Sequence, residues 1–108
     1  MSEMPKITVV MAAYNRANLI HTGIQSFLRQ NYSNKELLIC DDCSTDNTFG
    51  VIKRYAELDN RIKIHKNPKN LGMMGNWINS IPLCKNKYWG KLDADDYWDV
   101  NFIEQCIF

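Results

Sequence analysis

The sequence predicts an α/β fold in which a mostly parallel sheet is covered by helices on both faces. Segments with strand and helix patterns alternate along the chain, which is the order that a parallel sheet with helical crossovers requires. The first strand segment, 7–12, is nearly continuous in apolar residues, as a strand buried on both faces should be. A length of 108 residues has room for one domain at most, so we expect no internal domain boundary within residues 1–108.

The first part of the chain predicts two strands, each followed by a helix. After the first strand, pairs of apolar side chains recur every four positions from Leu19, which indicates a helix that runs to about Gln30. A second strand is predicted over 37–40. The second helix should be capped within 44–46, and its expected inner face consists of Val51, Ile52, Tyr55 and Ala56.

The later part predicts two more strands around a third helix. Residues 61–65 alternate between polar and apolar side chains, which indicates an edge or half-exposed strand, and a fourth strand is predicted over 88–92. The third helix ends at Pro82 and has an apolar stripe that we expect to pack in the core. This stripe consists of Met74, Trp77, Ile78 and Ile81.

A last helix is predicted to begin near Val100, with an apolar face that is still in progress at Phe108. The face consists of Val100, Ile103, Cys106 and Ile107. A domain seldom ends in the middle of such a stripe, so we expect a fragment of a larger protein, truncated at the C-terminus. Exposed apolar surface of this kind favours self-association, and we predict a homodimer through it.

Composition excludes several classes of function. The net charge is +1 with both signs interspersed, so there is no basic surface for nucleic acid. No apolar run reaches the roughly 20 residues of a membrane span, and the N-terminus lacks the pattern of a cleavable signal. The four cysteines, Cys40, Cys43, Cys84 and Cys106, form no regular framework, which is typical of reduced thiols in a cytoplasmic protein.

One C-x-x-C pattern, from Cys40 to Cys43, raises the alternative of a redox pair or half of a zinc site. Structural zinc needs four ligands, and no second pair lies at a suitable spacing. The two acidic residues between the cysteines should raise the thiol pKa values, which is the opposite of what a reactive thiolate needs. We therefore interpret Cys40 as a core residue.

Polar clusters follow three of the predicted strands at their carboxyl ends. They are 13–16, 41–42 and 93–96. In parallel sheets these ends lie at one edge, where ligands bind. The last cluster has three carboxylates within four residues; it is either a solvated acidic turn or a site for a hard divalent cation such as Mg²⁺ or Mn²⁺, usually shared with substrate phosphates.

These groups fit the parts of a nucleotide. Asp42 can accept a hydrogen bond from a base or a ribose hydroxyl, and Arg16 can place a positive charge near phosphates. Asp95 or Asp96 can hold a metal ion that bridges the phosphates and stabilises a departing diphosphate.

Five segments carry a resemblance to a known family, in the family's order and spacing. They are 7–16, 26–32, 36–46, 70–72 and 92–96. The chain resembles the N-terminal, nucleotide-sugar-binding half of family 2 glycosyltransferases, which have the Rossmann-like GT-A fold. The resemblance implies a metal-dependent enzyme that transfers a sugar, with inversion, from a UDP- or GDP-linked donor to a glycan, lipid or other acceptor.

The resemblance also implies residue roles. Asp42 would contact the base, and Asp93 and Asp95 would form the D-x-D motif. The implied nucleotide-sugar pocket comprises Ala12, Ala13, Tyr14, Asn15, Arg16, Asp42, Asp93, Ala94 and Asp95. The implied ligands of Mn²⁺ or Mg²⁺ are Asp93, Asp95 and Asp96.

Further implications concern the rest of such an enzyme. The general base of inverting transfer comes from the later, acceptor-binding half of the family, beyond Phe108, so no catalytic residue is assigned here and this chain alone should bind the donor without transferring sugar. The family analogy implies work in a polysaccharide pathway, with membrane association through parts outside this chain.

The chain departs from the family pattern at two places. Ala12 and Ala13 stand where a small hydroxyl residue is common before Tyr-Asn, so one polar contact is missing. After 70–72, many members have an Ala-Arg-Asn run, whereas this chain has Asn76-Trp77-Ile78-Asn79, so a phosphate contact from that helix is not expected.

Two other classes of protein share features with this sequence. A phosphoryl-accepting signalling domain is of similar length and binds Mg²⁺, but it needs paired acids after the first strand, where this chain has Ala-Ala-Tyr-Asn. A nucleotidyltransferase needs a glycine-rich phosphate loop at the same place, and 12–16 contains no glycine. A nucleotide-binding or phosphoryl-accepting signalling domain remains the alternative to a transferase.

Overall fold

The computed structural model describes residues 5–84, 86, 88–94, 98 and 103. Within them, four strands form one sheet in the order β3-β2-β1-β4, and every neighbouring pair is parallel. The elements are β1 (Ile7–Ala13), α1 (Ile20–Leu28), β2 (Lys35–Asp41), α2 (Thr48–Leu58), β3 (Ile62–Lys66), α3 (Gly72–Ser80), a short 3₁₀ turn (Ile81–Leu83) and β4 (Tyr88–Lys91). The predicted α/β class and the strand–helix alternation are confirmed.

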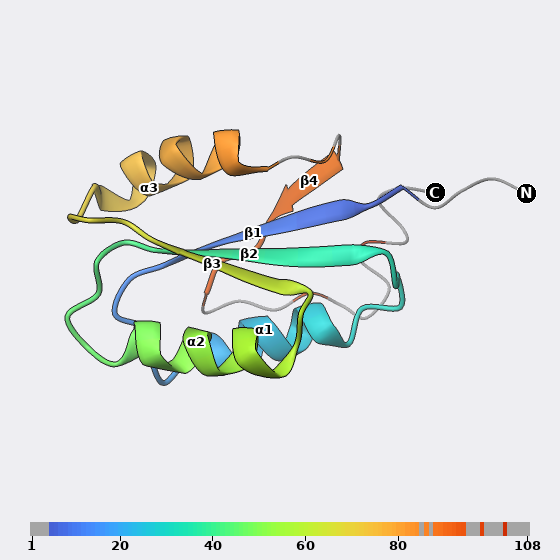
Figure 1. Ribbon diagram of the computed structural model, residues 1–108, viewed down its shortest axis with the longest axis horizontal. Helices are drawn as coiled ribbons and strands as arrows, with labels where there is room; N and C mark the ends of the chain where they lie inside the picture. The colour runs from blue at the N-terminus through green and yellow to red at the C-terminus, as the bar shows by residue number, and fades with distance from the viewer. Residues whose placement is uncertain (1–4, 85, 87, 95–97, 99–102, 104–108) are drawn as a thin grey trace, which may run out of the picture.

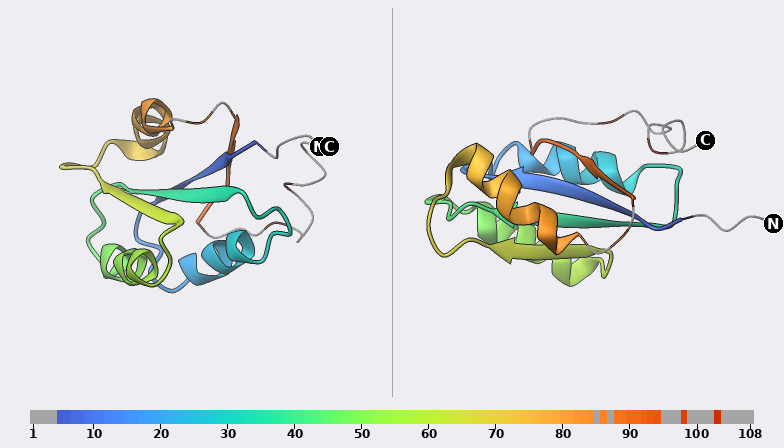
Figure 2. Two further views of the ribbon diagram at one scale, coloured as in Figure 1. Left: turned by 45° about the vertical axis from the view of Figure 1, so that its right-hand side comes forward. Right: turned by 90° about the horizontal axis from the view of Figure 1, so that it is seen from above.

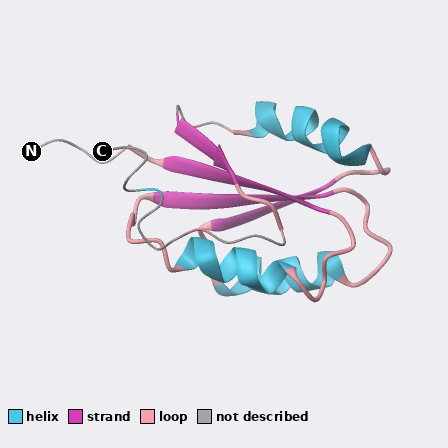
Figure 3. Cartoon of the chain, turned by 180° about the vertical axis from the view of Figure 1, so that it is seen from behind, coloured by secondary structure: helices cyan, strands magenta, loops and turns pink. Residues whose placement is uncertain are grey.

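Helices cover both faces of the sheet, as predicted. Figure 1 shows α1 and α2 side by side below the sheet and α3 above it. The same two layers of helices are seen in the turned views of Figure 2 and from behind in Figure 3. This arrangement leaves the carboxyl ends of β1 and β2 at one edge, between the two layers.

The core lies between the two central strands and the layer of α1 and α2. Val9 and Met11 of β1 and Ile39 of β2 are fully buried. Phe27 of α1 and Ile52 of α2 are also 0% exposed and belong to the same cluster. Of the inner face predicted for α2, only Ile52 is completely buried, and its neighbours pack against the core while half-exposed.

The strands of the sheet differ in length along their shared edges. β1 pairs with β2 over its whole length, from Ile7 to Ala13, but β4 pairs with β1 only from Ile7 to Val10. The last contact of this ladder is the hydrogen bond from Leu92 N to Val10 O, at 2.9 Å. In the part of the chain that the structure describes, the final residues of β1 therefore have a strand on one side alone.

The prediction that the apolar stripe of α3 packs in the core is wrong. Met74 and Ile78 are 72% and 62% exposed, whereas the buried residues of this helix are Asn76 and Ser80. Helical spacing defines a stripe but does not determine which side of the helix meets the sheet. Here side-chain hydrogen bonds of Asn76 to the β2 side of the sheet hold the polar side inward.

Some predictions fall on residues outside those described. Of the final helix predicted from Val100, the structure describes Ile103, which is buried and donates its N–H to Gln30 Oε1 at 3.0 Å. The other residues of its predicted apolar face, Val100, Cys106 and Ile107, lie outside the described residues, and the homodimer stays a prediction. Among the helices that the structure describes, none has the length and apolar character needed to cross a membrane.

Candidate functional site

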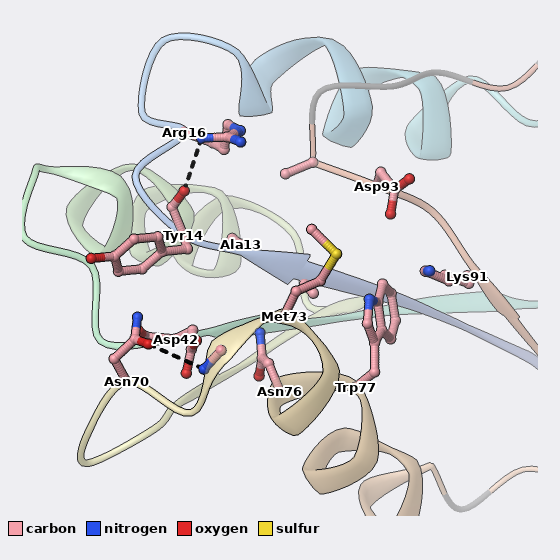
Figure 4. Close-up of a pocket in the computed structure, with 13 residues that line it drawn as sticks. Ala13, Tyr14, Arg16, Asp42, Asn70, Met73, Asn76, Trp77, Lys91 and Asp93 are labelled. Carbon is pink, nitrogen blue, oxygen red and sulfur yellow. Dashed lines mark hydrogen bonds between the residues drawn. The ribbon is translucent and has the colours of Figure 1, made fainter.

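A cavity of about 510 Å³ opens at the carboxyl ends of β1 and β2, a volume in the range of small-ligand sites. α3 forms its second wall, and the segment from Lys91 to Ala94 forms its third (Figure 4). The described residues that line it are Ala12, Ala13, Tyr14, Arg16, Asp42, Asn70, Gly72, Met73, Asn76, Trp77, Lys91, Asp93 and Ala94.

The loop after β1 is fastened to the loop after β2 through Asn15. The Asn15 side-chain oxygen accepts hydrogen bonds from Thr45 N at 2.8 Å and from Asp46 N at 3.3 Å. The Asn15 backbone N–H donates to Ser44 Oγ. Asn15 has a φ of 51°, a left-handed conformation that asparagine tolerates better than most residues. These bonds fix the backbone on which Tyr14 is presented to the cavity.

Arg16 lies at the mouth of the cavity and is held by the same pair of loops. Its backbone N–H donates to Thr48 Oγ1 at 2.8 Å, and its guanidinium donates to the carbonyl oxygens of Tyr14 and Asn15. The guanidinium is exposed and supplies a permanent positive charge next to the cavity.

The two acidic residues at the end of β2 have different surroundings. Asp41 is fully buried and accepts hydrogen bonds from the N–H and the hydroxyl of Ser44, so it shapes the turn. Asp42 lines the cavity. Cys43, the next residue, has a φ of 60°, an unfavourable conformation for a side chain of this type that typically costs about 1–2 kcal/mol.

Asp42 is 2% exposed and is bonded at almost every polar atom. Its Oδ1 accepts hydrogen bonds from Asn67 Nδ2 at 3.0 Å and from Leu71 N at 2.7 Å. Its backbone N–H donates to Ala13 O, and its carbonyl accepts from Asn70 Nδ2. This side of the cavity is therefore preformed.

The opposite side carries Lys91 and Asp93, both of which are exposed. The ammonium of Lys91 lies 4.4 Å from the centre of the Trp77 ring, a cation–π geometry. Figure 4 shows both side chains across the cavity from Asp42.

The structure brings most of the predicted pocket residues together. Ala12, Ala13, Tyr14, Arg16, Asp42, Asp93 and Ala94 all line the one cavity. Asn15 is outside its lining among the described residues, because its side chain fastens the two loops. Asp95 and Asp96 lie outside the described residues.

Sequence reasoning missed six residues of the lining. They are Asn70, Gly72, Met73, Asn76, Trp77 and Lys91. Asn76 and Asn79 are three positions apart and share one side of the predicted helix, so a polar helix face was visible in the sequence as a signal. It was outweighed there by the apolar stripe on the other side.

The metal prediction depends largely on residues outside those described. In the described part of the chain no group of three or more His, Cys, Asp or Glu side chains is arranged to hold a metal ion. Asp93 is the one member of the predicted ligand set that can be placed, and its carboxylate is an oxygen donor at the cavity, as a hard cation requires.

The interpretation of Cys40 as a core residue is confirmed, with a different physical cause for its unreactive thiol. Cys40 is 0% exposed. Burial, followed by the neighbouring Cys84, raises the pKa of the Cys40 thiol to about 12. Desolvation, and not the adjacent acidic residues, keeps this thiol protonated.

Comparison with known proteins identifies the family. The model of "Glycosyl transferase family 2" matches residues 8–108. The chain belongs to glycosyl transferase family 2. It is 38% identical over 104 residues to the Escherichia coli UDP-Glc:alpha-D-GlcNAc-diphosphoundecaprenol beta-1,3-glucosyltransferase WfaP, a match that covers 96% of this chain and 41% of the relative. It is also 34% identical over 106 residues to the Pasteurella multocida hyaluronan synthase, covering 98% of this chain and 11% of that protein.

Two solved structures share the fold. The mannosyltransferase PcManGT from Pyrobaculum calidifontis, in complex with GDP-Man and Mn²⁺, has a TM-score of 0.89 at 22% identity, over 98% of this chain and 32% of that one. S. aureus TarS 1-349 in complex with UDP has a TM-score of 0.85 at 24% identity, over 94% of this chain and 31% of that one. The likeness confirms the predicted GT-A half-domain. The chain thus spans between about a tenth and two-fifths of the length of these proteins.

Proposed function

We propose that this chain is the donor-binding part of an inverting, metal-dependent glycosyltransferase that uses a nucleotide-diphosphate sugar. The observation that carries the proposal is that Asp42 and Asp93, which follow the two strands on either side of β1, line one cavity at the carboxyl ends of the strands. Ligands of open parallel sheets bind at this edge. The names of the relatives support the donor class, since WfaP uses UDP-Glc and PcManGT is complexed with GDP-Man.

The proposed roles follow the chemistry of the two sides. Asp42, acceptor-only when ionised, binds an N–H of the base from the preformed side. Asp93 accepts from the ribose hydroxyls at the exposed side, and Arg16 places its charge near the diphosphate. Ala12, Ala13 and Tyr14 line the nucleotide pocket, in part through backbone groups.

The metal belongs to the same proposal. Asp93 together with Asp95 and Asp96 would hold Mn²⁺ or Mg²⁺, since a set of carboxylate oxygens suits a hard divalent ion. Such an ion, when bound, neutralises the diphosphate and stabilises it as a leaving group. The Mn²⁺ in the PcManGT complex supports this choice of metal. No general base is assigned among the described residues.

Calorimetric titration with UDP and with GDP, each with and without Mn²⁺, tests the proposal. We expect one of the two nucleotides to bind in the presence of Mn²⁺, at least about tenfold more weakly without it. Asp42→Asn should weaken binding by a further factor of about ten or more, because a hydrogen bond to a charged acceptor is lost. The matched control is Glu57→Gln, an exposed acid on α2 away from the cavity, which should bind as the wild type does. Binding of neither nucleotide, or equal affinity in Asp42→Asn, would contradict the proposal.

The signalling alternative is less well supported. β1 ends in Ala12-Ala13, and the loop after it begins with Tyr14-Asn15. The described site therefore has no pair of acids at the place where an acyl-phosphate site needs them. Incubation with acetyl phosphate and Mg²⁺, followed by intact-mass measurement, should show no added phosphoryl group.

A further inference from the structure

Asp42 presents a single oxygen to the cavity. Oδ1 accepts two hydrogen bonds, from Asn67 Nδ2 and Leu71 N, and Oδ2 has no donor within the described residues. In the same part of the chain, every buried side-chain nitrogen or oxygen has a partner. Oδ2 is therefore accessible, and because Asp42 lines the cavity, Oδ2 is accessible from the cavity.

The orientation of this carboxylate is set by a chain of buried amides. Asn67, which is 0% exposed, donates from Nδ2 both to Asp42 Oδ1 and to Asn76 Oδ1, the latter at 2.9 Å. Asn76, 2% exposed, donates in turn to the carbonyl oxygen of Cys40 at 3.0 Å. Asn79 Nδ2 donates to the remaining oxygen of Asn67 at 3.2 Å.

The Cys40 carbonyl fixes the direction of the whole chain. A carbonyl can only accept, so Asn76 must turn its NH₂ group to Cys40 and its oxygen to Asn67. Asn67 must then turn its own NH₂ group to Asn76, and the second hydrogen of that group points at Asp42 Oδ1. A flipped amide at either position would place oxygen against oxygen in a buried network, which is costly.

We propose that Asn76, acting through Asn67, is a positioning residue that selects nucleotides whose base has a ring N–H. With Oδ1 held, Oδ2 is an acceptor of fixed direction. Uracil and guanine offer a ring N–H to such an acceptor, whereas the corresponding ring nitrogens of cytosine and adenine are acceptors and are repelled by it. This inference rests on the proposed function, because it assumes that a nucleotide base occupies the Asp42 side.

Asn76 is the first residue of the segment in which the chain departs from the Ala-Arg-Asn run common in the family. The departure removes an arginine from the helix and supplies the amide that anchors Asn67 to β2.

The test compares UDP with UDP methylated at N3 of the uracil, which has no ring N–H. If the wild type prefers GDP in the titrations above, GDP and its N1-methylated form take their place. The wild type should bind the unmethylated nucleotide at least about tenfold more tightly, the size expected for one hydrogen bond to a charged acceptor. Asn76→Ala should lose most of that ratio, because binding of the unmethylated nucleotide weakens about five- to tenfold while binding of the methylated one changes less than about twofold.

Controls separate positioning from general damage. Ser80→Ala removes another buried polar side chain of α3 that bonds only to its own helix, and it should keep the wild-type ratio. Asn79 is exposed, so we expect the Asn79→Ala protein to fold even if Asn76→Ala does not. Asn79→Ala should reduce the ratio by about two- to threefold. Circular dichroism and thermal unfolding identify variants that fold.

Different failures have different meanings. A wild type that binds neither nucleotide, or that binds methylated and unmethylated forms equally, would refute the base contact in the proposed function. A wild type that discriminates, together with folded Asn76→Ala or Asn79→Ala proteins that discriminate equally well, would overturn the positioning role alone. Equal weakening of both nucleotides by Asn76→Ala would also overturn it.

Discussion

The β2 side and the β4 side of the cavity are built by different means. On the β2 side, Asp42 is almost completely buried and held by two donors on one oxygen. On the β4 side, Asp93 and Lys91 are exposed, and Lys91 packs over the Trp77 ring. The difference shows that the protein side chains on the β2 side, where we place the base, are already ordered before a ligand binds. On the β4 side, where we propose the diphosphate and the metal ion, the charged side chains are exposed.

The largest expected effect separates the two aspartates by their role in folding. Asp42→Ala leaves Leu71 N and one of the two Asn67 Nδ2 hydrogens without an acceptor, so we expect a loss of about 2–4 kcal/mol in the free energy of unfolding. Asp93→Ala, on the exposed side, should change it by less than about 0.5 kcal/mol. Urea denaturation measures both. A similar loss in the two variants would end the distinction between a preformed and an open side.

The loop fastening on the β2 side should show a pH dependence. Burial of Asp46 acts to raise its pKa, but hydrogen bonds from Thr48 and Ala17 outweigh this and hold the pKa of the carboxyl below its ordinary value of 3.8. Its stabilising contribution is therefore present above pH 3.8 and is lost as the pH falls through the lower, folded-state pKa.

Asp46→Asn tests this sign. At pH 7 the variant should be less stable by about 1 kcal/mol, because Asp46 Oδ1 caps the start of α2 by accepting from Thr48 N. The gap between wild type and variant should shrink as the pH falls below 3.8 in a series of urea titrations. A gap that stays constant down to pH 2.5 would contradict the assignment.

The strained turn beside Asp42 predicts a gain. Cys43→Gly removes the penalty for a φ of 60°, and after allowance for the entropy of glycine we expect a rise of about 0.5–1 kcal/mol in stability. Cys43→Ala keeps the β-carbon and should show no such rise, which makes it the matched control. Thermal unfolding of the two variants side by side gives the answer.

The smallest effect concerns the exposed side. Lys91→Met should weaken binding of UDP by about threefold, or of GDP if that is the nucleotide bound, because one positive charge next to the cavity is lost. Binding of the corresponding nucleoside, which has no phosphates, should be unchanged. Lys53→Met, an exposed lysine of α2, serves as the control. An equal effect on the nucleoside would place Lys91 at the base and would reverse the orientation proposed for the ligand.

The sequence was sufficient to predict the order of elements and the shared edge of the site. Buried strands such as 7–12 have a strong signal, and parallel pairing puts 13–16 and 41–42 together without further information. The inward side of α3 could not be predicted in the same way. It depends on hydrogen bonds between Asn76, Asn67 and the Cys40 carbonyl, which are 9 and 36 positions apart along the chain, and helical periodicity contains no information about such partners.

Asn15 shows a second limit. A polar residue directly after a central strand suggests a ligand contact, yet the Asn15 oxygen is used by Thr45 N and Asp46 N. A side chain that binds the neighbouring loop and one that binds a ligand have the same sequence pattern, since both need a short polar group at a turn. Only the partner loop, 29–31 positions away, distinguishes them.

The early end of β4 has a consequence for how a ligand is bound. Because β4 leaves the ladder at Val10 while β1 continues to Ala13, the last three residues of β1, a length of about 10 Å, have no strand on the β4 side in the described chain. Of these three, Ala12 turns its amide and carbonyl groups to that side, whereas the Ala13 carbonyl accepts from Asp42 N. A nucleoside is about that long. A ligand lying there would take the place of the missing length of strand, and a chain whose β4 was extended by three residues in register would fill its own binding site.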